Sequence, residues 1–316
     1  MRKTGTLRFW FGITVALAAS AGSAAAEPST PAPQIFAPGV ISGPANDGAP
    51  SFTPDGKTLF FTRSGSGAGT ILESHLVAGR WTPPQIAPFS GEYNDQHAAV
   101  APDGSYLIFV STRPVPGVAG RVAHLWRVAR TSGGWGVPEH LPAAVNVGPR
   151  IFKPSIAADG TVYFLSIGEG HTFGLYRSRC VAGVYQRAEA LPFSTAQTAD
   201  VDPEIAPDQS FLIFSSSGRR GADKNEHLYI VFQRAGVWGP VMPLRYAGDD
   251  ANGGSNDNEP DLSPDGRTLY FSSDRTLALH FPRTRAQAEA DLARIEAWDN
   301  GSTNVWTIPL DAWLAR

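Results

Sequence analysis

The sequence contains only one cysteine, Cys180, so no disulfide can form within the chain and its stability must come from a packed core. It also lacks a strong excess of either charge. The 26 basic and 29 acidic residues give a formal net charge of −3. This balance excludes the basic surface typical of proteins that bind nucleic acid or anionic membranes.

Long apolar runs are scarce as well. One run of about eleven residues, Phe9 to Ala19, follows a basic start and precedes the small residues Ala24 to Ala26. It is too short to span a bilayer, and this arrangement is typical of a secretory signal. No later run approaches the roughly twenty residues of a transmembrane helix. We therefore expect residues 1–26 to be a signal peptide cleaved near Ala26, and residues 27–316 to be periplasmic or secreted without membrane insertion.

Glycine and proline are plentiful, with 33 and 26 copies, and many of them lie in an internal repeat. Five segments share a tight turn, most often Pro-Asp-Gly, between two short apolar runs. The repeats cover about 49–90, 97–145, 153–195, 202–247 and 259–310, and their turn aspartates are Asp55, Asp103, Asp159, Asp208 and Asp265. A period near fifty with several short strands predicts an all-β propeller with one four-stranded blade per repeat.

Two further patterns support this architecture. A phenylalanine recurs in the second strand of every repeat, where a large ring would pack between neighbouring blades: Phe61, Phe109, Phe164, Phe214 and Phe271. The last repeat ends after its third strand, and residues 32–40 resemble a fourth strand. We expect that segment to complete the last blade, which favours five blades over the alternative of six and leaves no open sheet edge.

With their Pro-Asp-Gly turns and flanking strands, the repeats resemble the WD40-like β-propeller repeat of TolB-type periplasmic proteins. The resemblance covers nearly all of residues 32–316 and implies the fold. TolB itself has six blades and a separate domain ahead of them, for which this chain has no room. A role in the Tol–Pal system is therefore not implied, because one fold carries many activities.

Functional residues are expected on the face opposite the short Pro-Asp-Gly turns, where the variable loops lie: residues 112–123, 218–226 and 276–303. The last of these contains a predicted helix that starts at Pro282 and ends before Asn300-Gly301. Its apolar stripe comprises Ala288, Leu292, Ile295 and Trp298. We expect this stripe to lie on the propeller, with the helix acting as a cap, a lid or a docking site for a partner.

A row of charged residues recurs on the same face. Four aspartates stand eight residues before the turn aspartates, and four arginines end the second strands: Asp47, Asp95, Asp200, Asp257, Arg63, Arg113, Arg219 and Arg275. Equivalent positions meet around the ring axis, so the aspartates should encircle the channel mouth. Each would either pair with an arginine or help to bind a ligand or a cation, for which oxygen ligands favour Ca²⁺ or Mg²⁺.

These observations favour a non-catalytic binding or protein-interaction module, acting as a monomer on an envelope protein or a small polar or glycan ligand. No cofactor is expected apart from a cation at the channel mouth. The alternative is a propeller lyase or hydrolase that acts on a glycan or a peptide at the channel mouth. Because the charged row follows the repeat, it indicates architecture rather than catalysis, and no unmatched acid–base pair stands out. Glu204 and Asp261 come closest to one.

Overall fold

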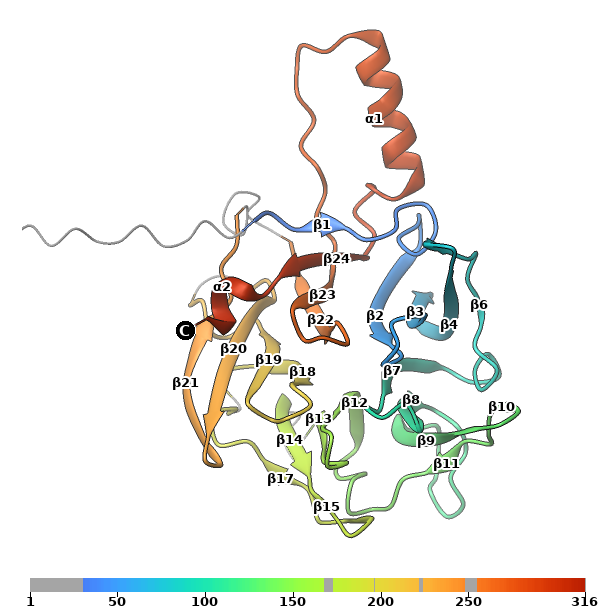
Figure 1. Cartoon of the computed structure of the whole chain (residues 1–316), viewed down its shortest axis with the longest axis vertical. Helices are drawn as coiled ribbons and strands as arrows, with labels where there is room; N and C mark the ends of the chain where they lie inside the picture. The colour runs from blue at the N-terminus through green and yellow to red at the C-terminus, as the bar shows by residue number, and fades with distance from the viewer. Residues whose placement is uncertain (1–30, 168–172, 196, 222–223, 248–254, 316) are drawn as a thin grey trace, which may run out of the picture.

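The computed structural model describes residues 31–167, 173–195, 197–221, 224–247 and 255–315. The predicted signal peptide lies outside these ranges. The described strands form five blade sheets around a central axis (Figure 1). The predicted five-bladed, all-β propeller is confirmed.

Each blade is an antiparallel meander that runs outward from the axis. Blade 1 contains β2 (Asn46–Phe52), β3 (Thr58–Gly65), β4 (Ala68–Val77), β5 (Arg80–Trp81) and β6 (Gln85–Ile86). Blade 2 contains β7 (Asp95–Val100), β8 (Tyr106–Ser111), β9 (His124–Thr131), β10 (Gly134–Trp135) and β11 (Glu139–His140). Blade 3 contains β12 (Arg150–Ile156), β13 (Val162–Ile167), β14 (Phe173–Ser178) and β17 (Glu189–Ala190), with a small hairpin of β15 (Cys180–Val181) and β16 (Val184–Tyr185). Cys180 therefore lies just beyond β14, the third strand of this blade.

The last two blades follow the same plan. Blade 4 contains β18 (Asp200–Ile205), β19 (Phe211–Ser216), β20 (His227–Arg234) and β21 (Val237–Pro243). Blade 5 contains β22 (Asp257–Leu262), β23 (Thr268–Ser273) and β24 (Asn304–Pro309), and its outermost strand is β1 (Gln34–Ile35). Ile35 is opposite Trp306 in that pairing. The amino-terminal segment thus closes the ring as the sequence indicates.

The core lies between neighbouring blades. All five recurrent phenylalanines are fully buried, because strand alternation directs them into the space between two sheets. Other aromatic residues extend the packing; the rings of Phe36 and Tyr270, for example, are 5.0 Å apart. The short helix α2 (Asp311–Leu314) adds the buried Trp313 to the core of blades 4 and 5.

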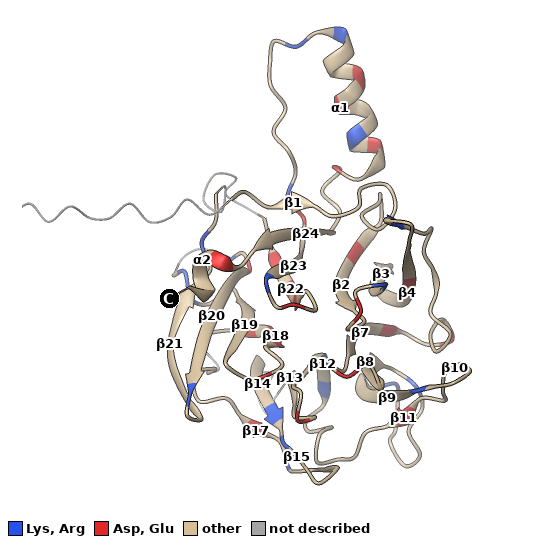
Figure 2. Cartoon of the chain, in the orientation of Figure 1, with Lys and Arg blue, Asp and Glu red and all other residues tan. Residues whose placement is uncertain are grey.

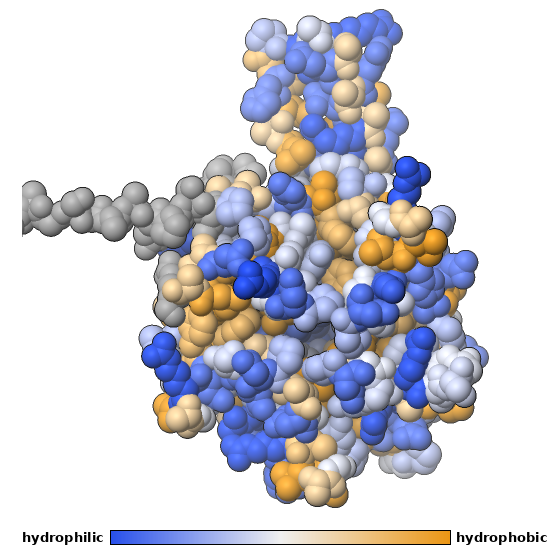
Figure 3. Space-filling view, viewed as in Figure 1, coloured by the Kyte–Doolittle hydropathy of each residue, from blue (hydrophilic) through white to orange (hydrophobic). Residues whose placement is uncertain are grey.

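The helical insertion differs from the prediction. Helix α1 (Arg285–Ala297) has Thr284 as its N-cap, two residues later than the expected start, and buries none of its residues. It projects outward from blade 5 instead of lying on the ring (Figure 1). Leu292, from the expected contact stripe, is 55% exposed, and only Trp298, at the end of the helix, reaches the core. The space-filling view shows polar and apolar residues mixed along the projecting arm (Figure 3).

Candidate functional site

Each of the five inner strands carries a β-bulge at the same place. In every bulge one residue other than glycine adopts a left-handed backbone, with φ between 40° and 54°: Ala49, His97, Lys153, Asp202 and Glu259. Such φ values are uncommon outside glycine and cost conformational energy, so the surrounding fold must hold them. We call these five positions the bulge ring.

The bulge ring is symmetric in backbone and asymmetric in chemistry. Its members all stand six residues before a turn aspartate, yet their side chains are a methyl group, an imidazole, an ammonium and two carboxylates. Charged positions accordingly surround the centre of the ring (Figure 2). The backbone geometry of this position is the same in every blade, but its ionisable groups differ. Such a position can form a single functional site in an otherwise symmetric fold.

His97 and Glu259 form the closest contact within this ring. The Nε2 atom of His97 lies 2.8 Å from Oε1 of Glu259, and the Ser272 hydroxyl donates to Oε2 at 2.7 Å. Burial disfavours the charged form of Glu259. The hydrogen bond and charge of His97, the bond from Ser272 and the charge of Lys153 outweigh this effect and lower the pKa of Glu259 to about 2.

The pKa of Asp202 is shifted in the opposite direction. Burial, followed by the negative charges of Glu259 and Glu226, raises the pKa of Asp202 to about 7. The backbone N–H of Glu259 donates to its Oδ2 atom at 3.4 Å, so the two acids are neighbours. One carboxylate that stays ionised therefore stands beside another that holds its proton up to neutral pH.

A second layer of polar residues lies deeper in the channel, two positions along each strand. Here Glu204 and Asp261 stand beside Ser51 and Ser155, around a cavity of about 90 Å³ that reaches the Pro-Asp-Gly face. Burial raises the pKa of both acids, and the charge of Glu204 raises that of Asp261 further. The Lys153 ammonium, 3.8 Å from Glu204, compensates part of this negative charge.

Two buried polar atoms of the bulge ring have no hydrogen-bond partner in the protein. They are Nζ of Lys153, a residue with no exposed surface, and Nδ1 of His97, a residue that is 9% exposed. Buried polar groups are almost always paired with protein, water or ligand. These two atoms are therefore available to bond to water or to a ligand.

Above the bulge ring, on the face of the variable loops, the channel opens into a cavity of about 260 Å³. Its lining is rich in amides and hydroxyls: Asn46, Gly48, Thr62, Ser64, Gln96, His97, Asn258, Glu259 and Thr303. Asn258 is held by its Nδ2 atom, which donates to Glu226 at 2.7 Å. This wall offers both donors and acceptors to a polar ligand.

The row of aspartates and arginines predicted from the sequence forms four ion pairs. Each aspartate is buried and lies 2.6–2.7 Å from the arginine of its own blade: Arg63–Asp47, Arg113–Asp95, Arg219–Asp200 and Arg275–Asp257. Burial raises the pKa of Asp47 despite the hydrogen bond and charge of Arg63. Arg113 and Arg219 also donate to the backbone oxygens of Phe89 and Phe193. The pairs thus tie loops to strands.

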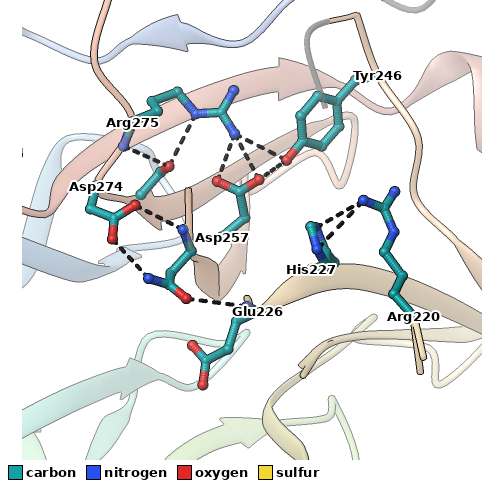
Figure 4. A network of polar contacts seen from close by, with 9 residues as sticks. Arg220, Glu226, His227, Tyr246, Asp257, Asp274 and Arg275 are labelled. Carbon is teal, nitrogen blue, oxygen red and sulfur yellow. Dashed lines mark hydrogen bonds and ion pairs between the residues drawn. The ribbon is translucent and has the colours of Figure 1, made fainter. Parts of the chain in front are cut away.

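Figure 4 shows how this arrangement is extended in blade 5. The Arg275 guanidinium donates to both oxygens of Asp257, and the Tyr246 hydroxyl donates to the same carboxylate. Beside it, Asn256 donates to Asp274 at 2.8 Å and accepts from the backbone N–H of Glu226 at 3.2 Å. This network links two loops near the cavity and leaves the Glu226 side chain beside Asn258.

The four aspartates thus pair with arginines, one of the two roles expected for them from the sequence, and none of them lines the loop-face cavity. The aspartates precede the bulges. Because each bulge inserts one residue, the in-and-out alternation of side chains before the bulge does not continue after it. Among the described residues, no group of three or more histidine, cysteine or acidic residues is arranged to hold a metal ion. The acid–base pair not identified from the sequence is His97–Glu259, two residues beyond the predicted row.

Comparison with known proteins supports the fold. No family model and no curated protein matches the sequence. Among solved structures, the putative TolB from Agrobacterium tumefaciens matches with a TM-score of 0.50 and 17% identity, over 84% of this chain and 91% of that one. The chain has a TolB-like propeller fold.

Two other solved structures match with TM-scores below 0.5. TolB from Acinetobacter baumannii is 22% identical with a TM-score of 0.47, and the match covers 69% of this chain but only 46% of that protein. A thermostable family-43 glycoside hydrolase matches with a TM-score of 0.49 and 12% identity, over 75% of this chain and 86% of that one. Identities this low show the fold alone, so the function of this TolB-like propeller has to be inferred from its own residues. No helix in the described ranges has the length and apolarity needed to span a membrane.

Proposed function

We propose that this protein is an exported, periplasmic binding module that holds a small polyhydroxylated ligand, such as one sugar unit of a glycan, in the loop-face cavity without converting it. The observation that carries the proposal is that two buried atoms in the ring below that cavity, Lys153 Nζ and His97 Nδ1, have no hydrogen-bond partner in the protein, although Nζ lies 3.8 Å from the Glu204 carboxylate. A ligand that extends into the ring would satisfy them.

The chemistry of the site favours hydroxyl groups. A hydroxyl both donates and accepts, so it can accept from the Lys153 ammonium while it donates to an ionised carboxylate such as Glu259. The amides of Gln96 and Asn258 line the same cavity and serve either role. No arginine or lysine is among its lining residues, which disfavours phosphorylated or other strongly anionic ligands.

Direct titration tests this proposal. Mature protein would be titrated with glucose, galactose and N-acetylglucosamine, and then with short glycans, by isothermal calorimetry. We expect saturable binding that Gln96→Ala and Asn258→Ala weaken by roughly tenfold each, the loss of a hydrogen bond. Gln85→Ala, an amide at the outer edge of blade 1, is the matched control. Absence of sugar binding, or equal loss in the control, would contradict the proposal.

A second candidate function is a hydrolase or lyase that acts on the same ligand. The observation that favours it is the split between Asp202, which holds a proton to about pH 7, and Glu259, which is ionised from about pH 2. In general acid–base catalysis, two neighbouring acids with different pKa values commonly serve as the acid and the base. Release of reducing sugar from a bound glycan, abolished by Asp202→Asn with binding retained, would replace the binding role by this one.

A further inference from the structure

A third cavity lies in the seam between blades 2 and 3 on the Pro-Asp-Gly face. It measures about 310 Å³, which is within the range of small-molecule sites. Its lining joins the turns of both blades to strand β9 and to the β15–β16 hairpin, and its polar members are Asp103, Tyr106, Arg127, Asp159, Cys180 and Tyr185.

Two substitutions within the repeat open this seam. The fourth strand of the other blades with this motif carries a tryptophan that fills the seam; Trp135, for example, lies 5.6 Å from Phe60 and Trp238 lies 5.4 Å from Phe193. Blade 3 has the smaller Tyr185 at that position and Ala158 in place of the turn proline. The space that a tryptophan fills elsewhere is therefore left as a cavity.

Arg127 presents an uncommitted cation to this cavity. Its guanidinium lies 4.0 Å from the centre of the Tyr106 ring, and its buried Nε has no hydrogen-bond partner. The equivalent Arg177 of blade 3 instead binds its cross-strand neighbour Glu189 at 2.8 Å. Arg127 has a cross-strand glutamate too, Glu139, but in the part of the chain that the structure describes no ion pair joins a carboxylate to its guanidinium. Stacking on the Tyr106 ring orients the Arg127 guanidinium so that it can bind a planar anion such as a carboxylate.

The rim of the cavity has the opposite charge. The carboxylates of the two turn aspartates, Asp103 and Asp159, lie at its edge and are exposed. Bonds from the backbone and hydroxyl of Ser105 keep the pKa of Asp103 low, so this group is ionised. A ligand that fits therefore needs a negative group for the floor and a positive group for the rim, whereas an anion alone would be repelled by the rim.

We propose that this seam is a second binding site, for a small α-amino acid. The carboxylate of the ligand would pair with the Arg127 fork, its ammonium group would lie between Asp103 and Asp159, and its side chain would rest against Tyr185. This site is separate from the loop-face cavity and the sugar ligand proposed above, since those two cavities share no lining residue.

The test compares three probes of similar size: L-alanine, L-lactate, which lacks the ammonium group, and ethylamine, which lacks the carboxylate. Binding to the mature protein would be followed by NMR shift changes and calorimetry. We expect L-alanine to bind best. Arg127→Gln should weaken it about ten- to a hundredfold, the loss of a charge-assisted hydrogen bond. Arg130→Gln removes a nearby arginine that stacks on Trp135 outside the cavity and should leave binding unchanged.

A second variant separates loss of the site from loss of the fold. Tyr185→Trp restores the residue found in the other seams and should block L-alanine while leaving all charges in place and the melting temperature unchanged or higher. Failure of all three probes to bind up to their solubility limits would overturn the proposal. L-alanine binding that survives both Arg127→Gln and Tyr185→Trp would overturn it as well.

Discussion

His97 and Glu259 are separated by 162 residues in the chain, yet their side chains meet at 2.8 Å and join blade 2 to blade 5 across blade 1. Blade 1 permits this contact because its own member of the bulge ring, Ala49, carries only a methyl group. Both residues line the loop-face cavity, so the contact forms part of the wall of the candidate site.

The low pKa of Glu259 makes this contact a source of stability at neutral pH. Its pKa falls from 4.5 to about 2 on folding, so the stabilisation is complete above pH 4.5 and is lost as the pH falls toward 2. Relative to Glu259→Gln, the wild type should be more stable by on the order of 2 kcal/mol at pH 7. Urea unfolding at pH 7 and pH 3 checks this, and a constant difference would contradict the assigned charge.

Asp202 should make the folded protein less stable at neutral and higher pH. Its pKa rises from 3.8 to about 7 on folding, so the folded state resists ionisation and the protein loses stability as the pH rises through this interval. Asp202→Asn removes that penalty. We expect the variant to exceed the wild type by on the order of 2 kcal/mol at pH 8 and to match it near pH 4. Thermal melts of both proteins from pH 4 to pH 8 measure this difference in stability. A variant less stable than the wild type at pH 8 would show that ionisation of Asp202 does not destabilise the folded state.

Gly48 provides the space that the contact needs. A methyl group added there would lie 2.5 Å from Oε2 of Glu259 and 2.6 Å from the Ser272 hydroxyl. Gly48→Ala should therefore displace Glu259 and cost about 1–3 kcal/mol, as overpacking does. Gly65→Ala is the control, because nothing lies within 4 Å of its added methyl group. Equal urea midpoints for the two variants would refute the crowding argument.

The Asp–Arg pairs should act as structural ties that need no metal. Arg113→Ala leaves the buried Asp95 carboxylate without its partner, at a cost of about 3–5 kcal/mol. Arg285→Ala removes an exposed pair with Glu289 and should change stability by less than about 0.5 kcal/mol. Chelator should leave the wild-type melt unchanged. A melt that chelator lowers and Ca²⁺ or Mg²⁺ restores would make this row a cation site instead.

Much of this architecture could be predicted because it repeats. The turn aspartates and the phenylalanines such as Phe271 recur at nearly constant spacing, and spacing alone determines blade number and core. Closure by residues 32–40 could be predicted from the missing fourth strand. The ion pairs were visible as a recurring row, although their orientation was not.

The bulge ring could not be predicted, because a left-handed φ at residues as different as Ala49 and Lys153 leaves no common residue signature. The one signal was a repeat position whose residue changes from blade to blade although a proline follows it in four of the five repeats. The direction of helix α1 was unpredictable for a related reason. Its periodicity indicates one covered side, but the helix buries none of its residues, and Asp291 pairs with Arg283 of the arm's own extended limb at 2.6 Å.

The most direct measurement of the proposed function is a crystal structure of the mature protein soaked with the sugar that binds most tightly in solution. The account predicts sugar density in the loop-face cavity, with a hydroxyl within hydrogen-bond distance of Lys153 Nζ or His97 Nδ1. Density for the sugar elsewhere on the propeller, with only water beside these two atoms, would contradict it.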